Sequence, residues 1–140
     1  MDWQTDDTAV RELLDAALAT RERAYAPYSH FAVGAALGLS NGAVVAGCNV
    51  ENASYGLTLC AERVAIFRAV AEHGLGTPDG PRISALAIVL PGDPPGTPCG
   101  ACRQVLAEFA GDGCPVYCGS LTGAVTTYTL DELLPNAFRL

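Results

Sequence analysis

Residues 32–48 have the sequence AVGAALGLSNGAVVAGC, in which two apolar runs flank Ser40-Asn41-Gly42. Asn-Gly between two apolar runs is the strongest short-range signal for a β-hairpin, because both residues tolerate the positive φ angles of a tight turn. We therefore predict two antiparallel strands, Ala32–Leu39 and Val44–Cys48.

The segments on either side of this hairpin alternate between helical and strand patterns. Before it, apolar residues recur at helical spacing from Val10 to Leu18. After it, periodicity and turn residues predict a helix over Leu59–His73, a strand over Ile83–Leu90, a helix over Cys99–Ala110, short strands over Val116–Cys118 and Val125–Tyr128, and a last helical turn opened by the capping-box pattern Thr129-x-x-Glu132.

The order of these elements indicates the fold class. Alternation of this kind is typical of an α/β fold in which one mixed sheet is covered by helices on both faces. In the second helix, Val64, Phe67, Val70 and Ala71 form the apolar face, and Gly74 is the expected stop. A chain of 140 residues is long enough for one core, so we expect a single domain over residues 1–140.

Composition and charge exclude several classes of function. The formal net charge is −7, and all 8 basic residues are arginines. Nucleic acids and anionic membrane surfaces are disfavoured as partners, because binding to either needs clustered cationic side chains. The lack of lysine excludes Schiff-base chemistry and a phosphate-loop lysine. No apolar run is long enough to span a bilayer, and Met1–Asp7 lacks the pattern of a secretory signal, so we expect a soluble, cytoplasmic protein.

Three of the six cysteines stand at predicted loop-to-helix junctions. Cys60 begins the second helix, and Cys99 and Cys102 begin the third. Thiolates are good zinc ligands, and the positive end of a helix stabilises their charge. Three protein ligands would leave one tetrahedral position open for water, which distinguishes a catalytic zinc from a structural one. Glu62, two residues beyond Cys60, would then reach the water rather than the metal.

A zinc ion held by three thiolates carries a net negative charge, so positive groups must compensate for it. The two helix N-termini and Arg63 are the candidates. We expect Arg63 and Gln104 to donate hydrogen bonds to the sulfurs.

A second arrangement of the cysteines is possible. Cys99, Cys102, Cys114 and Cys118 form two close pairs, which could build a closed structural zinc site in a small binding module. That reading leaves Cys60-Ala61-Glu62 without a role. Cys48, Cys114 and Cys118 are better interpreted as small buried hydrophobic residues on or beside strands.

Cys60-x-Glu62 followed by Pro98-Cys99-x-x-Cys102 resembles the signature of the zinc-dependent nucleobase and nucleoside deaminases. Over about Ala24–Phe138 the chain is similar to the short, homotetrameric cytidine deaminases. The blocks that carry this resemblance are FAVGAA (31–36), GCNVENA (47–53), CAER (60–63), PCGACRQVL (98–106) and LLP (133–135). Asn136 stands where a glycine is common in that family.

The resemblance implies a three-layer α-β-α sandwich with a mixed five-stranded sheet, one Zn²⁺ per subunit, and defined roles for particular residues. Phe31 would stack on the base, Asn49 and Glu51 would hold the ribose hydroxyls, and the Ala61 amide would contact the pyrimidine edge. Tyr55 and Phe138 match residues that close the site of a neighbouring subunit in the family's tetramer.

The resemblance also implies the reaction, which is the hydrolysis of cytidine and 2′-deoxycytidine to uridine and 2′-deoxyuridine with release of ammonia. Glu62 would take a proton from the attacking water, pass it to N3 of cytosine, and later protonate the leaving amine. Deamination of a polynucleotide or of a nucleoside antibiotic, and a non-catalytic zinc module, remain as alternatives. The acidic charge favours a small nucleoside over a polynucleotide.

Overall fold

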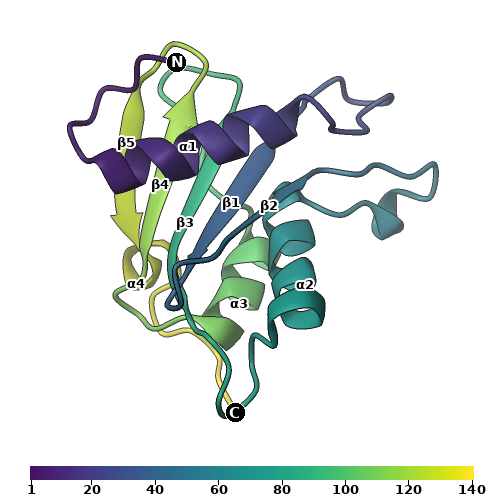
Figure 1. Ribbon diagram of the computed structural model, residues 1–140. Helices are drawn as coiled ribbons and strands as arrows, with labels where there is room; N and C mark the ends of the chain where they lie inside the picture. The colour runs from purple at the N-terminus through teal and green to yellow at the C-terminus, as the bar shows by residue number, and fades with distance from the viewer.

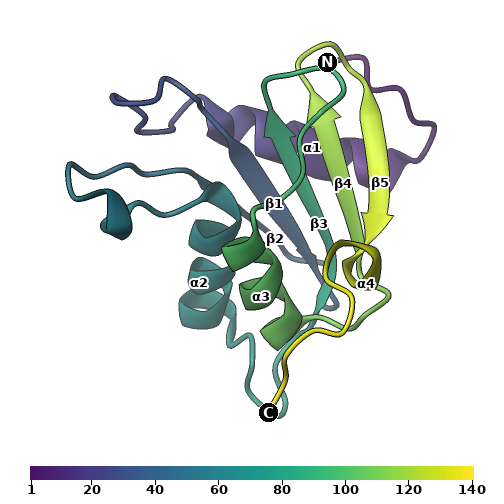
Figure 2. The same ribbon diagram turned by 180° about the vertical axis from the view of Figure 1, so that it is seen from behind.

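The computed structural model describes residues 1–140 and consists of a five-stranded mixed sheet between two layers of helices (Figures 1 and 2). The strands are β1 (Gly34–Leu39), β2 (Val44–Cys48), β3 (Ile83–Leu90), β4 (Pro115–Ser120) and β5 (Val125–Thr129), in the spatial order β2-β1-β3-β4-β5. Only β3 and β4 pair in parallel. The helix α1 (Thr8–Arg21) crosses one face, and α2 (Ala61–His73) and α3 (Gly100–Phe109) cover the other. The predicted three-layer α/β fold is confirmed.

The alternation of side chains along the inner strands divides the core in two, because successive residues of a strand point to opposite faces. Leu37 and Ile88 belong to a large cluster on the side of α2 and α3. Ala36 and Ala87 belong to a smaller cluster with Leu14 of α1. Both faces of the sheet are therefore buried.

The predicted hairpin is present, with Ala36 opposite Ala46 and a φ of 87° at Gly42 in the turn. β1 begins at Gly34 rather than Ala32. The reason is that the Val33 amide donates to Oδ1 of Asn49, a side-chain atom, at 2.8 Å instead of continuing the regular ladder.

The helix ends follow the capping signals in the sequence. The Asp7 side chain accepts hydrogen bonds from the amides of Ala9 and Val10 and so caps α1. Gly74 ends α2 in the left-handed conformation at a φ of 70°. Thr129 and Glu132 form the predicted capping box at the start of α4 (Leu130–Leu133). A short 3-10 helix, η1 (Tyr55–Leu57), was not predicted.

The prediction that Val64, Phe67, Val70 and Ala71 form the buried face of the second helix, α2, is wrong. Ala61, Glu62, Ala65, Ile66 and Ala69 are buried, whereas Phe67 and Val70 are 44% and 40% exposed. The cause is close contact between α2 and β2. A Cβ atom added at Gly47 would lie 2.6 Å from the Ala65 nitrogen and 2.7 Å from the Ala61 oxygen. Only small residues fit on the side of α2 that faces this strand.

No helix of the structure is both long and apolar enough to cross a membrane.

The close contact between α2 and β2 at Gly47 predicts that Gly47→Ala destabilises the protein. The added methyl group would push α2 away from β2 at a cost of about 1–3 kcal/mol, typical of overpacking. Gly111→Ala is the matched control, because nothing lies within 4 Å of a Cβ at that position. Urea unfolding at one protein concentration checks both variants. Equal midpoints for Gly47→Ala and the wild type would contradict the close contact.

Candidate active site

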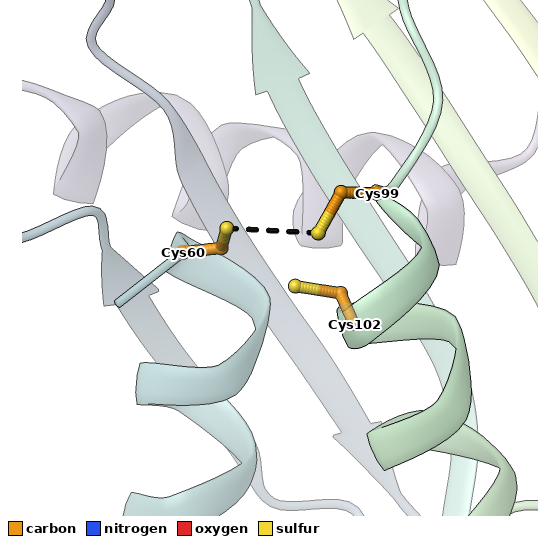
Figure 3. Close-up of side chains that lie close together, drawn as sticks. All are labelled: Cys60, Cys99 and Cys102. Atoms are coloured by element: carbon orange, nitrogen blue, oxygen red, sulfur yellow. Dashed lines mark hydrogen bonds between the residues drawn. The ribbon is translucent and has the colours of Figure 1, made fainter. Parts of the chain in front are cut away.

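Three sulfur atoms converge where α2 and α3 begin. Cys60 is the N-cap of α2, Cys99 is the N-cap of α3, and Cys102 lies in the first turn of α3. The three sulfurs all lie within 4.8 Å of one another, and those of Cys60 and Cys99 are 3.7 Å apart. Figure 3 shows the three side chains pointing toward one another. The predicted grouping is therefore present, while Cys114 and Cys118 lie outside it.

The surroundings of the sulfurs favour thiolates. Hydrogen bonding from Cys102 and then from Arg63 lowers the pKa of Cys60 to about 5 in spite of its burial. Nη2 of Arg63 donates to the Cys60 sulfur at 3.4 Å, as predicted from the sequence. Neither helix N-terminus is capped by a side chain, so both present free amides and a positive dipole end to the cluster.

The cluster fits a zinc ion by the chemistry of its donors. Hydrogen bonding with the Cys60 sulfur, together with burial, raises the pKa of Cys102 while that of Cys60 falls. Thiols this close can all ionise only beside a positive charge greater than Arg63 supplies. A divalent cation with a preference for sulfur meets that need, and Zn²⁺ is the common ion of this kind in four-coordinate sites. Cys60, Cys99 and Cys102 are the residues that would hold it.

Glu62 lies beside the sulfurs and is almost completely buried, with 5% of its surface exposed. The Cys102 thiol donates to its Oε2 at 3.5 Å. Burial raises the pKa of Glu62, so this carboxyl holds a proton more readily than an exposed one. A buried carboxyl with these properties is suited to accept and return a proton.

A cavity of about 390 Å³ opens onto Glu62 and the sulfur cluster. Its wall contains most of the residues that the sequence singled out, namely Phe31, Asn49, Glu51, Cys60, Ala61, Glu62 and Cys99. Phe31 is 44% exposed, so its ring is available to an occupant of the cavity. The volume suits a small molecule such as a nucleoside.

Asn49 holds one wall of this cavity in place. Its Oδ1 accepts from the Val33 amide and its Nδ2 donates to the Phe31 carbonyl, both at 2.8 Å. The amide retains one free hydrogen and one free lone pair for a ligand. The structure therefore gives Asn49 a contact with the backbone of Phe31 that the sequence did not suggest.

Glu51 is bound to a loop 22 residues away in sequence. Its carboxylate accepts hydrogen bonds from the amides of Tyr28 and Ser29 and from the Ser29 hydroxyl. These bonds, led by that of the hydroxyl, lower the pKa of Glu51. Ser29 also lines the cavity, and it could not be predicted from the sequence, because no local pattern marks its contact with Glu51.

Tyr55 and Phe138 do not reach the cavity of their own chain. Tyr55 is 77% exposed and stacks edge-on against Tyr28, with ring centroids 6.2 Å apart. Phe138 is 68% exposed near the C-terminus. The two segments that carry Tyr28 and Tyr55 project from the body on the same side in Figures 1 and 2, the first after α1 and the second after β2.

The prediction that Gln104 donates a hydrogen bond to a cysteine sulfur is wrong. Nε2 of Gln104 donates instead to the Phe138 carbonyl at 2.9 Å, because the C-terminal segment returns alongside α3. Asn136 in this segment has a φ of 56°. Asparagine is one of the few residues besides glycine that tolerate this left-handed conformation, which explains how it can replace a glycine here.

The sequence is similar to known proteins over most of its length. Residues 7–118 match the family model of the cytidine and deoxycytidylate deaminase zinc-binding region. A cytidine deaminase of Halalkalibacterium halodurans is 50% identical over 126 residues, which cover 90% of this chain and 91% of that protein. A cytidine deaminase of Sporosarcina psychrophila is 47% identical over 130 residues, which cover 92% of this chain and 90% of that protein.

Solved structures agree with this match. The crystal structure of cytidine deaminase from Burkholderia pseudomallei has a TM-score of 0.83 and 47% identity, covering 91% of this chain and 98% of that one. The crystal structure of cytidine deaminase from Mycobacterium tuberculosis has a TM-score of 0.77 and 40% identity, covering 96% of this chain and 100% of that one. The chain therefore belongs to the cytidine and deoxycytidylate deaminase family.

Proposed function

We propose that this protein hydrolyses free cytidine and 2′-deoxycytidine to uridine and 2′-deoxyuridine with release of ammonia, using one zinc ion per chain. The observation that carries the proposal is the position of Glu62, buried beside three clustered cysteines and facing a cavity with an exposed aromatic ring. This arrangement combines a proton carrier, a metal site and a surface for a planar base.

Each residue of the site has a task in the proposed reaction. Cys60, Cys99 and Cys102 would hold the zinc ion, which when bound would lower the pKa of a water molecule, the nucleophile for C4 of cytosine. Glu62 accepts a proton from the attacking water and delivers it to N3. Glu62 then takes the second proton from the new C4 hydroxyl and passes it to the amine, so that the C4–N bond breaks, C4 becomes a carbonyl and the amine leaves as ammonia. Arg63 donates to Cys60 and balances part of the thiolate charge.

The remaining cavity residues would hold the nucleoside. The Phe31 ring offers a face to the pyrimidine, and the backbone amide of Ala61 is a candidate donor to its polar edge. Asn49 keeps Phe31 in place and retains hydrogen-bonding capacity for a ribose hydroxyl. Glu51, whose carboxylate faces the same cavity, is the second candidate contact to the sugar.

The size and charge of the site favour a free nucleoside over the alternatives. A polynucleotide would meet a chain of net charge −7 with no lysine. A closed four-cysteine module is not favoured, because Cys114 and Cys118 lie outside the sulfur cluster.

Glu62→Gln tests the proton carrier. The amide has nearly the same shape but cannot accept the proton, so we expect kcat for cytidine to fall by at least about two orders of magnitude. Zinc content should stay at that of the wild type, because Glu62 is not one of the three proposed ligands. Ultraviolet turnover assays and metal analysis measure both quantities. Turnover near that of the wild type would contradict the mechanism.

Single cysteine substitutions test the metal site. Cys60→Ser, Cys99→Ser and Cys102→Ser should each weaken zinc binding and abolish turnover, since each removes one of three thiolates. Cys114→Ala is the matched control, because this cysteine is buried but lies outside the cluster. Zinc per chain is measured after dialysis against a chelator. Loss of zinc in Cys114→Ala with retention in Cys60→Ser would support the closed four-cysteine site instead.

We also infer a homotetramer in which neighbouring chains complete the active sites. Tyr28, Tyr55, Leu57 and Phe138 are large apolar side chains, each at least 50% exposed, and three of them lie on the two projecting segments beside the cavity. Tyr55 and Phe138 are the residues proposed to reach a neighbour's site. A second copy of the chain would bury this apolar surface.

A mixing experiment tests this sharing of sites. Phe138→Ala keeps Glu62 but loses the shared ring, whereas Glu62→Gln keeps the ring but is inactive. When the two are refolded together, we expect turnover above the mean of the two separate proteins, because Phe138 from one chain completes the site of the other. Turnover equal to that mean would place any contribution of Phe138 within its own chain. Sedimentation velocity verifies that mixed oligomers form.

A further inference from the structure

The connection between β3 and α3, residues 91–98, forms part of the cavity wall and leads directly into Cys99. Thr97 lines the cavity together with Leu90 and Cys99 at the two ends of this connection. None of the backbone-to-backbone hydrogen bonds outside the regular helices and strands involves residues 91–98. A proline- and glycine-rich segment without such bonds needs side chains to fix its position.

Arg103 supplies most of that fixation. Its Nε donates to the Pro98 carbonyl at 2.7 Å, and its Nη2 donates to the Thr97 hydroxyl at 2.8 Å. The only other side-chain hydrogen bond to the connection joins Thr122 to Asp93. Asp93 lies near the β3 end of the connection, away from the end that leads into Cys99. The part of the wall next to Cys99 therefore depends on one guanidinium group.

The same guanidinium ties the wall to the C-terminal part of the fold. Its Nη1 donates to the Leu133 carbonyl at 2.6 Å, at the end of α4. The last carbonyls of a helix lack partners within the helix, so a cationic donor is favourable there. Arg103 forms no salt bridge with a carboxylate, and its three acceptors are all neutral oxygens.

We propose that Arg103 is a positioning residue for the reaction, which holds Thr97 and Pro98 against α4 and thereby fixes the cavity wall beside Cys99. The proposal rests on the proposed deaminase function. The planar guanidinium presents donors in a fixed fork, which the single ammonium group of lysine cannot reproduce. Without the guanidinium of Arg103, Thr97 and Pro98 are no longer held in place. The cytosine ring is then positioned less well relative to Glu62, although the zinc ligands are intact.

The test compares Arg103→Ala, Arg103→Lys, Thr97→Val and the double variant Arg103→Ala/Thr97→Val with the wild type. Measurements are kcat and KM for cytidine, the Kd of uridine by calorimetry, zinc per chain and the Tm. Arg68→Ala is the matched control, because Arg68 also donates from a helix to a backbone carbonyl, that of Ala46, but neither Arg68 nor its acceptor belongs to the cavity wall.

For Arg103→Ala we expect kcat/KM to fall by roughly 10- to 100-fold, the range for hydrogen bonds from a charged donor, and uridine to bind more weakly. Zinc content should not change. Millimolar guanidinium should restore part of kcat/KM in Arg103→Ala, and Arg103→Lys should remain impaired. Thr97→Val should cost less in the Arg103→Ala background than alone, because the bond between the two residues is already lost. Arg68→Ala should behave like the wild type.

Wild-type kcat/KM and uridine affinity in Arg103→Ala would overturn the proposal. So would a loss of turnover that follows zinc loss or unfolding and that guanidinium does not relieve. If Arg103→Ala does not fold, Arg103→Lys and Thr97→Val decide the matter, since wild-type values in both would also overturn it. Failure of the proposed function is a separate result, because the wild type itself would then not convert cytidine.

Discussion

Charge repulsion among three sulfurs that lie within 4.8 Å of one another is the constraint on which this site depends. Two helix N-termini and Arg63 supply part of the opposing charge, and a divalent cation would supply the rest. The first turns of α2 and α3 must therefore lie next to each other. The close approach of α2 to β2 at Gly47 sets the position of Cys60, and the connection held by Arg103 sets that of Cys99.

The residues of the site differ in how far they are exposed to solvent, and each degree of exposure suits a different task. Glu62 is buried, which suits it to hold a proton, whereas Phe31 stays accessible to a ligand. Asn49 holds the segment that carries Phe31 in place by bonding the backbone of Phe31 and Val33, and it also lines the cavity. A small acidic protein that has few cationic side chains can in this way bind a nucleoside, because a nucleoside carries no charge.

Local signals in the sequence predicted the order of helices and strands, since caps, turns and periodicity are properties of neighbouring residues. They also predicted the sulfur cluster, because Cys60 and Cys99 each mark a helix start. The buried face of α2 could not be predicted, as it depends on how closely Gly47 approaches Ala65. The partners of Gln104 and Glu51 were missed for a similar reason, since they come from distant segments of the chain.

The site and the family together assign to this acidic chain the deamination of a free nucleoside. The most direct test is the change in ultraviolet absorbance when the zinc-loaded protein is mixed with cytidine, with cytidine monophosphate and a cytosine-containing oligonucleotide in parallel. We predict conversion of cytidine to uridine without conversion of the oligonucleotide. Reaction of the oligonucleotide alone, or no reaction with any of the three while zinc stays bound, would contradict deamination of a free nucleoside.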